Sequence, residues 1–152
     1  MEKYILNNIH QLYRSHIVTL VLLLLLGCVA LFVVVGVVKF DLIKSKIGKI
    51  ILMMATIISL VVLLLVQILS IVPIYKDYKE SSYVVIENAR LTILTEASGV
   101  IDRTNTVLID DGSAEPFKLK MQTDLCLSFD CTYTGTIAYT INSGYVVWYS
   151  FD

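Results

Sequence analysis

The two cysteines near the C-terminal end are the side chains with the clearest potential chemistry. Cys126 and Cys131 are five positions apart, an odd offset that puts them on opposite faces of a straight strand. A disulfide between them therefore requires a turn within residues 128–130. We expect this bond if the segment lies in an oxidising compartment, and two ordinary thiols if it lies in the cytoplasm.

Acidic side chains are the second candidate group, because carboxylate oxygens are the ligands that calcium prefers. Asp110, Asp111 and Glu115 are close in sequence, but their spacing misses the EF-hand pattern, so we interpret them as solvated turn residues. The other acidic side chains that could supply oxygen ligands are Asp102, Asp124 and Asp130. A carboxylate pair for glycoside hydrolysis has no support in the sequence, and a small β domain leaves little room for a sugar cleft.

The two histidines of the chain, His10 and His16, are six positions apart, which is not the i, i+4 spacing of a metal pair on one helix face. The region after residue 75 contains no histidine, which excludes a histidine-based triad or a Cys–His pair there. The sequence therefore predicts no catalytic residue, no metal site and no cofactor, and a protein that is not an enzyme. A metal-binding or enzymatic domain built on carboxylates is the alternative that stays open.

Two long apolar runs organise the rest of the chain. Residues 17–38 contain neither a charge nor a proline, and residues 50–72 are uncharged and end before Pro73. Each run reaches the roughly 20 residues that cross a hydrocarbon core as a helix. We therefore predict a two-helix transmembrane hairpin over residues 17–73, in which Gly27, Cys28 and Gly36 allow close helix packing.

The basic link at residues 39–49 decides the expected orientation. Its lysines are Lys39, Lys44, Lys46 and Lys49, and the opposite side carries Lys3, Arg14, Lys76 and Lys79. The two counts are equal, but the flank that follows the first helix is the more basic, and the N-terminal tail is short enough to translocate. We expect the link in the cytoplasm and both termini outside; the opposite orientation stays open.

The residues that flank the hairpin are expected at the membrane surface. Within residues 1–16, apolar side chains recur at helical spacing, which indicates an interfacial segment; a frayed N-terminus is the alternative. After Pro73, aromatic and basic residues suited to the headgroup level act as anchors in this prediction: Tyr75, Lys76, Tyr78 and Lys79.

Residues 80–152 have the pattern of a small all-β domain. Strands are expected over residues 83–95, 104–109, 117–122, 133–141 and 145–151, the first with a bulge near Asn88 where its apolar face changes parity. Five or six strands in this length predict a closed or nearly closed barrel of the OB or SH3-like kind. Two membrane helices followed by such a barrel, over residues 17–152, resemble the architecture of the NfeD family of membrane-anchored OB proteins, a resemblance that carries over no site residue.

Aromatic side chains in the last strand provide a candidate interaction surface. Trp148 has the opposite parity to Tyr145 and Tyr149, so one of these sets faces outward, toward the membrane or a partner. Residues 75–152 carry eleven acidic and six basic side chains, which argues against nucleic acid as the partner of this part of the chain.

The features together predict an integral protein of the bilayer, expected in a bacterial plasma membrane, with its β domain on the extracytoplasmic side. We expect this domain to bind another membrane or envelope protein, as an accessory or scaffold subunit. A membrane-anchored immunity protein that protects against a toxin is the alternative. The sequence leaves the partner and any homo-oligomer undetermined.

Overall fold

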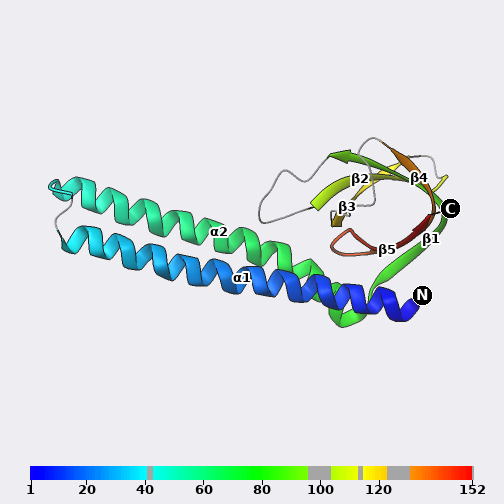
Figure 1. Ribbon diagram of the computed structural model, residues 1–152, viewed down its shortest axis with the longest axis horizontal. Coiled ribbons are helices and arrows are strands. Elements are labelled where there is room, and N and C mark those ends of the chain that lie inside the picture. The colour runs from blue at the N-terminus through cyan, green and yellow to red at the C-terminus, as the bar shows by residue number, and fades with distance from the viewer. Residues whose placement is uncertain (41–42, 96–103, 113–114, 123–130, 152) are drawn as a thin grey trace. The chain divides into compact units, whose positions relative to one another are not determined.

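The chain forms two helices followed by an all-β region, the order that the sequence predicts. The structure, a computed structural model, describes residues 1–40, 43–95, 104–112, 115–122 and 131–151. Within these ranges the helices are α1 (Glu2–Lys39) and α2 (Lys46–Glu80). The strands are β1 (Tyr83–Thr95), β2 (Thr104–Asp110), β3 (Phe117–Gln122), β4 (Thr132–Thr140) and β5 (Tyr145–Phe151) (Figure 1).

Two compact units divide the chain. Residues 1–13 and 73–152 form one of them, here called the β unit, and residues 14–72 form the other, the helical unit. The sequence predicts residues 1–16 as a separate interfacial segment, whereas in the structure the first thirteen residues pack into the β unit. The reason is an apolar face: Ile5, Ile9 and Leu12 are at most 5% exposed.

The helical unit contains the two apolar runs, whose side chains point outward along most of their length. Both α1 and α2 are long and apolar enough to cross a membrane, and only 6% of the most apolar window of each is buried. Phe32 is 82% exposed and Leu69 is 71% exposed. Because exposed apolar surface around most of a helix is unfavourable in water, this exposure fits membrane association.

Helix α2 continues through Pro73 for seven more residues, although the sequence places the end of the apolar run there. Proline lacks the N–H that would bond to the carbonyl four residues earlier, so a helix gains nothing locally by continuing past it. What favours the continuation is burial, because Ile74 and Asp77 on the following turn are both enclosed by the β unit.

The five strands form one sheet that closes on itself. Their order is β1-β2-β3-β5-β4, and β4 pairs again with β1, so each strand has two neighbours. All pairs are antiparallel except the short β3–β5 contact at Lys120–Met121. The long β1 makes closure possible, because it pairs with β4 from Tyr83 onward and with β2 from Arg90 onward.

A bulge in β1 confirms the parity change predicted near Asn88. The register with β4 passes from Ile86↔Ile137 to Ala89↔Gly135, so two residues of β1 lie opposite one of β4. Asn88 takes a left-handed backbone conformation with a φ of 56°, which asparagine tolerates better than most residues. Beyond the bulge, Ala89, Leu91 and Ile93 all point into the sheet interior.

The interior of the closed sheet is an apolar core. Its buried members are Ala89, Leu91, Ile93, Val107, Ile109, Leu119, Met121, Ile137 and Val146. Side chains alternate along β3, since Leu119 and Met121 belong to this core, Phe117 packs against it, and Lys118 and Lys120 are exposed. Gly135 is required for closure: a Cβ atom there would lie 2.8 Å from the Cα of Phe151 on the neighbouring strand.

Candidate functional site

The aromatic residues of β5 do not share one face. Tyr149 packs against the interior core, whereas Tyr145 and Trp148 lie on the other side of the sheet. The separation arises from a bulge, because the β4–β5 register passes from Tyr139↔Val146 to Ala138↔Trp148 and leaves Val147 without a partner on β4. Tyr145 is only 5% exposed, so it is unavailable for the outward patch that the sequence suggests, and Trp148 is half-buried.

The chain itself covers this outer side of β4 and β5. A second buried cluster, here called the helix-end cluster, consists of Ile5, Ile9, Leu12, Ile74, Ala138, Tyr145 and Val147. Trp148 packs against it, as do Tyr83 and Val85 from the start of β1. Ile5, Ile9 and Leu12 are spaced four and three residues apart, which places them on one face of α1. Both helix ends therefore act as a cover for the sheet.

A hydrogen bond joins the bulge in β5 to α1. The side-chain amide of Asn8 donates to the carbonyl oxygen of Val147 at 2.6 Å. A carbonyl left without a ladder partner at a buried position would destabilise the fold, and Asn8 supplies the missing donor. The sequence gives no sign of this role, because Asn7 and Asn8 are indistinguishable until the bulge is known.

Asp77 ties the end of α2 to the turn between β4 and β5. Its carboxylate is fully buried and accepts three hydrogen bonds. The backbone N–H and side-chain amide of Asn142 donate to Oδ1 at 2.9 and 2.7 Å, and the backbone N–H of Ser143 donates to Oδ2 at 2.8 Å. Sequence reasoning missed Asp77 as a buried residue, because the predicted helix ends at Pro73 and the structure extends it to Glu80.

Residues of the β4–β5 turn also stabilise it with hydrogen bonds among themselves. Thr140 Oγ1 lies 2.7 Å from Ser143 Oγ and accepts a bond from the backbone N–H of Tyr145 at 2.8 Å. Gly144 has a φ of 67°, which glycine adopts without strain. Helix α2 ends with Ser81 in a left-handed conformation and the Ser82 N–H bonded to the Asp77 carbonyl, a Schellman-type cap. The joint between helix and hairpin is thus built from satisfied polar groups.

The predicted membrane-surface anchors lie at this helix end, and two of them join an aromatic cluster. Tyr78 stacks on Tyr13 with centroids 4.7 Å apart and meets His10 edge-on at 4.5 Å. Tyr75 lies 5.7 Å from Tyr13 and is exposed. Lys76 and Lys79 are exposed on the same turns of α2. Basic and aromatic side chains are therefore close together here, and their placement at the headgroup level stays a prediction.

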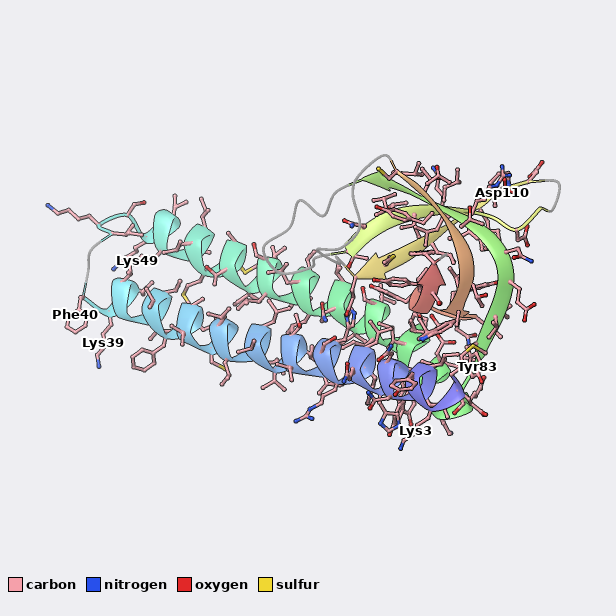
Figure 2. The ribbon with its side chains drawn as sticks, turned by 45° about the vertical axis from the view of Figure 1, so that its right-hand side comes forward. Lys3, Lys39, Phe40, Lys49, Tyr83 and Asp110 are labelled. Atoms are coloured by element: carbon pink, nitrogen blue, oxygen red, sulfur yellow. The ribbon has the colours of Figure 1, made fainter. Side chains whose placement is uncertain are left out.

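The lysines predicted to determine topology lie where α1 ends and α2 begins. Lys39, Lys44 and Lys46 are exposed, and Lys49 is half-buried. Figure 2 labels Lys39, Phe40 and Lys49 in this link. Ser45 caps α2, since its Oγ accepts the backbone N–H of Gly48 at 3.3 Å.

The other candidate chemical residues are not brought together in the described part of the chain. Cys131 is exposed directly before β4, but Cys126 lies outside the described residues, so the disulfide stays a prediction. Asp110 Oδ1 accepts the Gly112 N–H at 3.0 Å, as a turn residue does. Among the described residues no group of three His, Cys, Asp or Glu side chains could hold a metal ion. Asp102, Asp124 and Asp130 fall outside those residues.

One sheet face in the β unit has no cover from the helix ends. It lies on the outer side of β1, β2 and β3, and we call it the outer β1–β3 face: Arg90, Thr92, Leu94, Thr106, Leu108, Lys118 and Lys120. Leu108 lies at its centre, opposite Thr92 on one strand and Lys118 on the other. Among the described residues, β2 and β3 supply no apolar side chain to the helix-end cluster, and Lys120 reaches its edge with its ammonium 5.5 Å from the centre of the Tyr145 ring. Among the described residues the helix ends leave this face uncovered, and it is mixed in polarity, with three basic side chains and the carboxylate-bearing Asp110 opposite Arg90.

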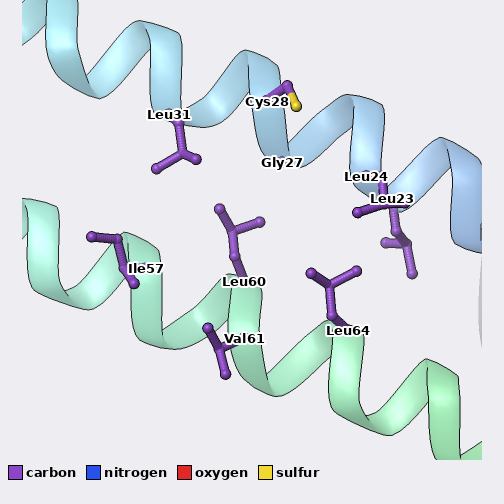
Figure 3. Close-up of a pocket in the computed structure, with 9 residues that line it drawn as sticks. All are labelled: Leu23, Leu24, Gly27, Cys28, Leu31, Ile57, Leu60, Val61 and Leu64. Atoms are coloured by element: carbon purple, nitrogen blue, oxygen red, sulfur yellow. The ribbon is translucent and has the colours of Figure 1, made fainter.

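The helical unit contains an apolar groove between its two helices. Its volume is about 240 Å³, and the side chains around Gly27 and Leu60 line it, including Cys28 (Figure 3). A Cβ atom on Gly27 would lie 2.9 Å from Leu60 Cδ2, whereas one on Gly36 would meet nothing within 4 Å. Gly27 therefore fits the prediction of close helix packing, and Gly36 does not.

Comparison with known proteins assigns no relative. No protein-family model matches the chain, and neither a curated protein nor a solved structure matches it.

Proposed function

We propose that this protein is a two-helix membrane anchor whose OB-like β barrel binds another protein of the cell envelope. The observation that carries the proposal is the contrast between the two outer sides of the sheet. The chain's own helix ends cover the β4–β5 side, whereas in the described part of the chain they leave the outer β1–β3 face uncovered. A sheet that has one covered and one open face is suited to presenting the open face to a partner.

The anchor part of the proposal rests on the exposed apolar surface of both helices. Helices of this length and hydropathy, with 6% of their apolar windows buried, match the requirement for spanning a bilayer. The strand order and closure of the sheet support the OB-like form of the barrel. In OB folds the face of strands 2 and 3 often carries the ligand, and here the same strands contribute most of the open face.

The chemistry of the open face favours a protein partner with an acidic surface. Arg90, Lys118 and Lys120 surround the half-buried Leu108, so an apolar contact would lie inside a basic rim. Stacking of bases needs exposed aromatic rings, and the outward residues that the structure describes on β1, β2 and β3 beyond the β1 bulge include none. We propose a binding role and no catalytic one.

Site-specific photo-crosslinking tests the binding face in cells of the source organism. A photoreactive amino acid replaces Leu108 in the full chain, and in a second version it replaces Ile141, which is exposed in the β4–β5 turn. We expect a discrete protein adduct from position 108, weakened by Lys118→Glu with Lys120→Glu, and none of the same size from position 141. Equal adducts from both positions, or none from position 108, would contradict the proposed face.

Thiol labelling tests the proposed side of the membrane. Cys131 is exposed at the edge of β4, and we propose that it faces the outside of the cell. A membrane-impermeant reagent is expected to label intact cells at this position, after reduction if Cys126 is bonded to it, and the label should disappear in Cys126→Ser with Cys131→Ser. Labelling only after permeabilisation would reverse the orientation and direct the search to cytoplasmic partners.

A further inference from the structure

The link between the two helices combines exposed cations with exposed apolar side chains. Lys39, Lys44 and Lys46 are exposed, and among them Phe40 is 76% and Ile47 is 70% exposed. A link with only exposed lysines would be most stable in water, and a link with only exposed aromatic and aliphatic side chains would be most stable in hydrocarbon. Both kinds of side chain together suit the boundary layer of a membrane, where ammonium groups meet phosphates and apolar groups enter the acyl region.

The start of α2 adds an electrostatic argument. Its first turn contains Lys46 and Lys49 and no acidic residue. The N-terminal end of a helix carries a partial positive charge that acidic side chains normally offset, so two lysines there increase the local positive potential. The only acidic residue in residues 39–49 is Asp41, against four lysines. An anion from outside the chain is what this charge distribution favours.

We propose that the exposed side chains at the end of α1 and the start of α2 form a binding surface for anionic phospholipid headgroups: Lys39, Phe40, Lys44, Lys46 and Ile47. The proposal rests on the membrane anchor proposed above, and it assigns the link a ligand in addition to a role in topology. Lys39, Lys44 and Lys46 contact lipid phosphates, and Phe40 and Ile47 insert beside them. The same surface discriminates between anionic and zwitterionic lipids, because each lysine near an anionic surface favours association about fivefold.

Lipid-specific fluorescence quenching of the full chain tests this surface. Phe40→Trp in a Trp148→Phe background places the only tryptophan in the link, and the protein is reconstituted in phosphatidylcholine vesicles that contain phosphatidylglycerol. Brominated versions of either lipid quench the tryptophan, and the ratio of the two effects gives the preference at position 40. We expect a several-fold preference for phosphatidylglycerol that declines toward equality as salt screens the charges.

Two sets of substitutions complete the test. Lys39→Gln, Lys44→Gln and Lys46→Gln together are expected to abolish the preference, whereas the control pair Lys3→Gln and Arg14→Gln, at exposed basic residues outside the link, is expected to leave it unchanged. Equal quenching by both lipids in the parent protein, or a preference that survives the first set, would overturn the proposal. The basic side chains of the link would then be assigned to binding an acidic protein instead. Absence of quenching by either lipid would instead contradict the membrane anchor itself.

Discussion

The β unit and the helical unit are both rich in large aliphatic side chains but use them in opposite ways. In the β unit, Ile9 and Ile74 are no more than 1% exposed, because the sheet and the helix ends enclose them. In the helical unit, Leu26 is 63% exposed, and most of its neighbours are similar. The same residue type thus stabilises the β unit by internal packing, whereas in the helical unit it supplies apolar surface for contact with an external apolar environment.

Polar groups show the same contrast. The β unit buries Asp77 and Thr140 with partners for their oxygen atoms. The hydroxyls of Thr19, Thr56 and Ser70 in the helical unit bond to the carbonyl four residues earlier in their own helix. The helical unit also has a long-range bond, from the Gln67 amide to the His16 carbonyl at 3.4 Å, whereas the buried Asp77 of the β unit accepts all three of its hydrogen bonds from residues 65 and 66 positions away.

Trp148 provides the readout for the first three predictions. It is the only tryptophan in the chain and packs against the helix-end cluster, so its fluorescence reports unfolding of the β unit in the full, detergent-solubilised protein. Each substitution below is paired with a matched residue for which the comparison predicts a smaller effect.

The largest expected effect comes from shortening a buried isoleucine. Ile9→Ala should lower the free energy of unfolding of the β unit by about 2–5 kcal/mol, because it leaves a cavity between α1 and the sheet. Leu26→Ala removes as much apolar surface in the helical unit, but detergent already covers that side chain, so we expect no change in the Trp148 transition. Equal effects of the two substitutions in urea titrations would contradict the stated difference between internal packing in the β unit and external exposure in the helical unit.

Removal of the Asp77 carboxylate is expected to come next. Asp77→Ala leaves the backbone N–H groups of Asn142 and Ser143 without acceptors in a buried site, which should cost about 3 kcal/mol. Asp110→Ala removes a single bond in an exposed turn and should cost about 0.5 kcal/mol. Thermal unfolding of both variants beside the parent protein measures the difference, and an Asp77→Ala midpoint equal to that of Asp110→Ala would show that the joint contributes little.

The bulge contact of Asn8 should have an intermediate effect. Asn8→Ala leaves the Val147 carbonyl without its donor and is expected to cost about 1 kcal/mol. Asn7→Ala, one residue earlier and exposed, should cost less than about 0.5 kcal/mol. Urea titrations followed by Trp148 fluorescence resolve this difference; a larger loss in Asn7→Ala would contradict the assigned hydrogen bond.

The smallest effects are expected inside the helical unit. Gly36→Ala meets open space and should stabilise α1 by about 0.5–1 kcal/mol through its higher helix propensity. Gly27→Ala has the same gain in propensity but displaces the end of Leu60, so its net effect should be smaller. Helicity measured by circular dichroism during titration with a denaturing detergent compares the two. A greater gain for Gly27→Ala would mean that the helices do not pack at this residue.

Short-range patterns were enough for much of the fold. The bounds of β1, β3 and β5 agree with those expected, because alternation and turn residues are local properties of a strand. The bulge at Asn88 was also visible, since a change of parity in one strand needs no knowledge of its neighbour. The second bulge, at Val147, escaped notice because apolar side chains are present on both sides of β5.

The sequence by itself determined the two apolar helices, the five strands and the charge pattern of the link, because hydropathy, periodicity and charge depend on residues near one another in the chain. Only the tertiary structure decided that residues 1–13 join the β unit, that Asp77 is a buried hydrogen-bond acceptor and that β1–β3 retain the open face. These features join residues up to 139 positions apart, as in the bond from Asn8 to Val147. Contacts at such separations depend on where closure of the sheet brings each strand.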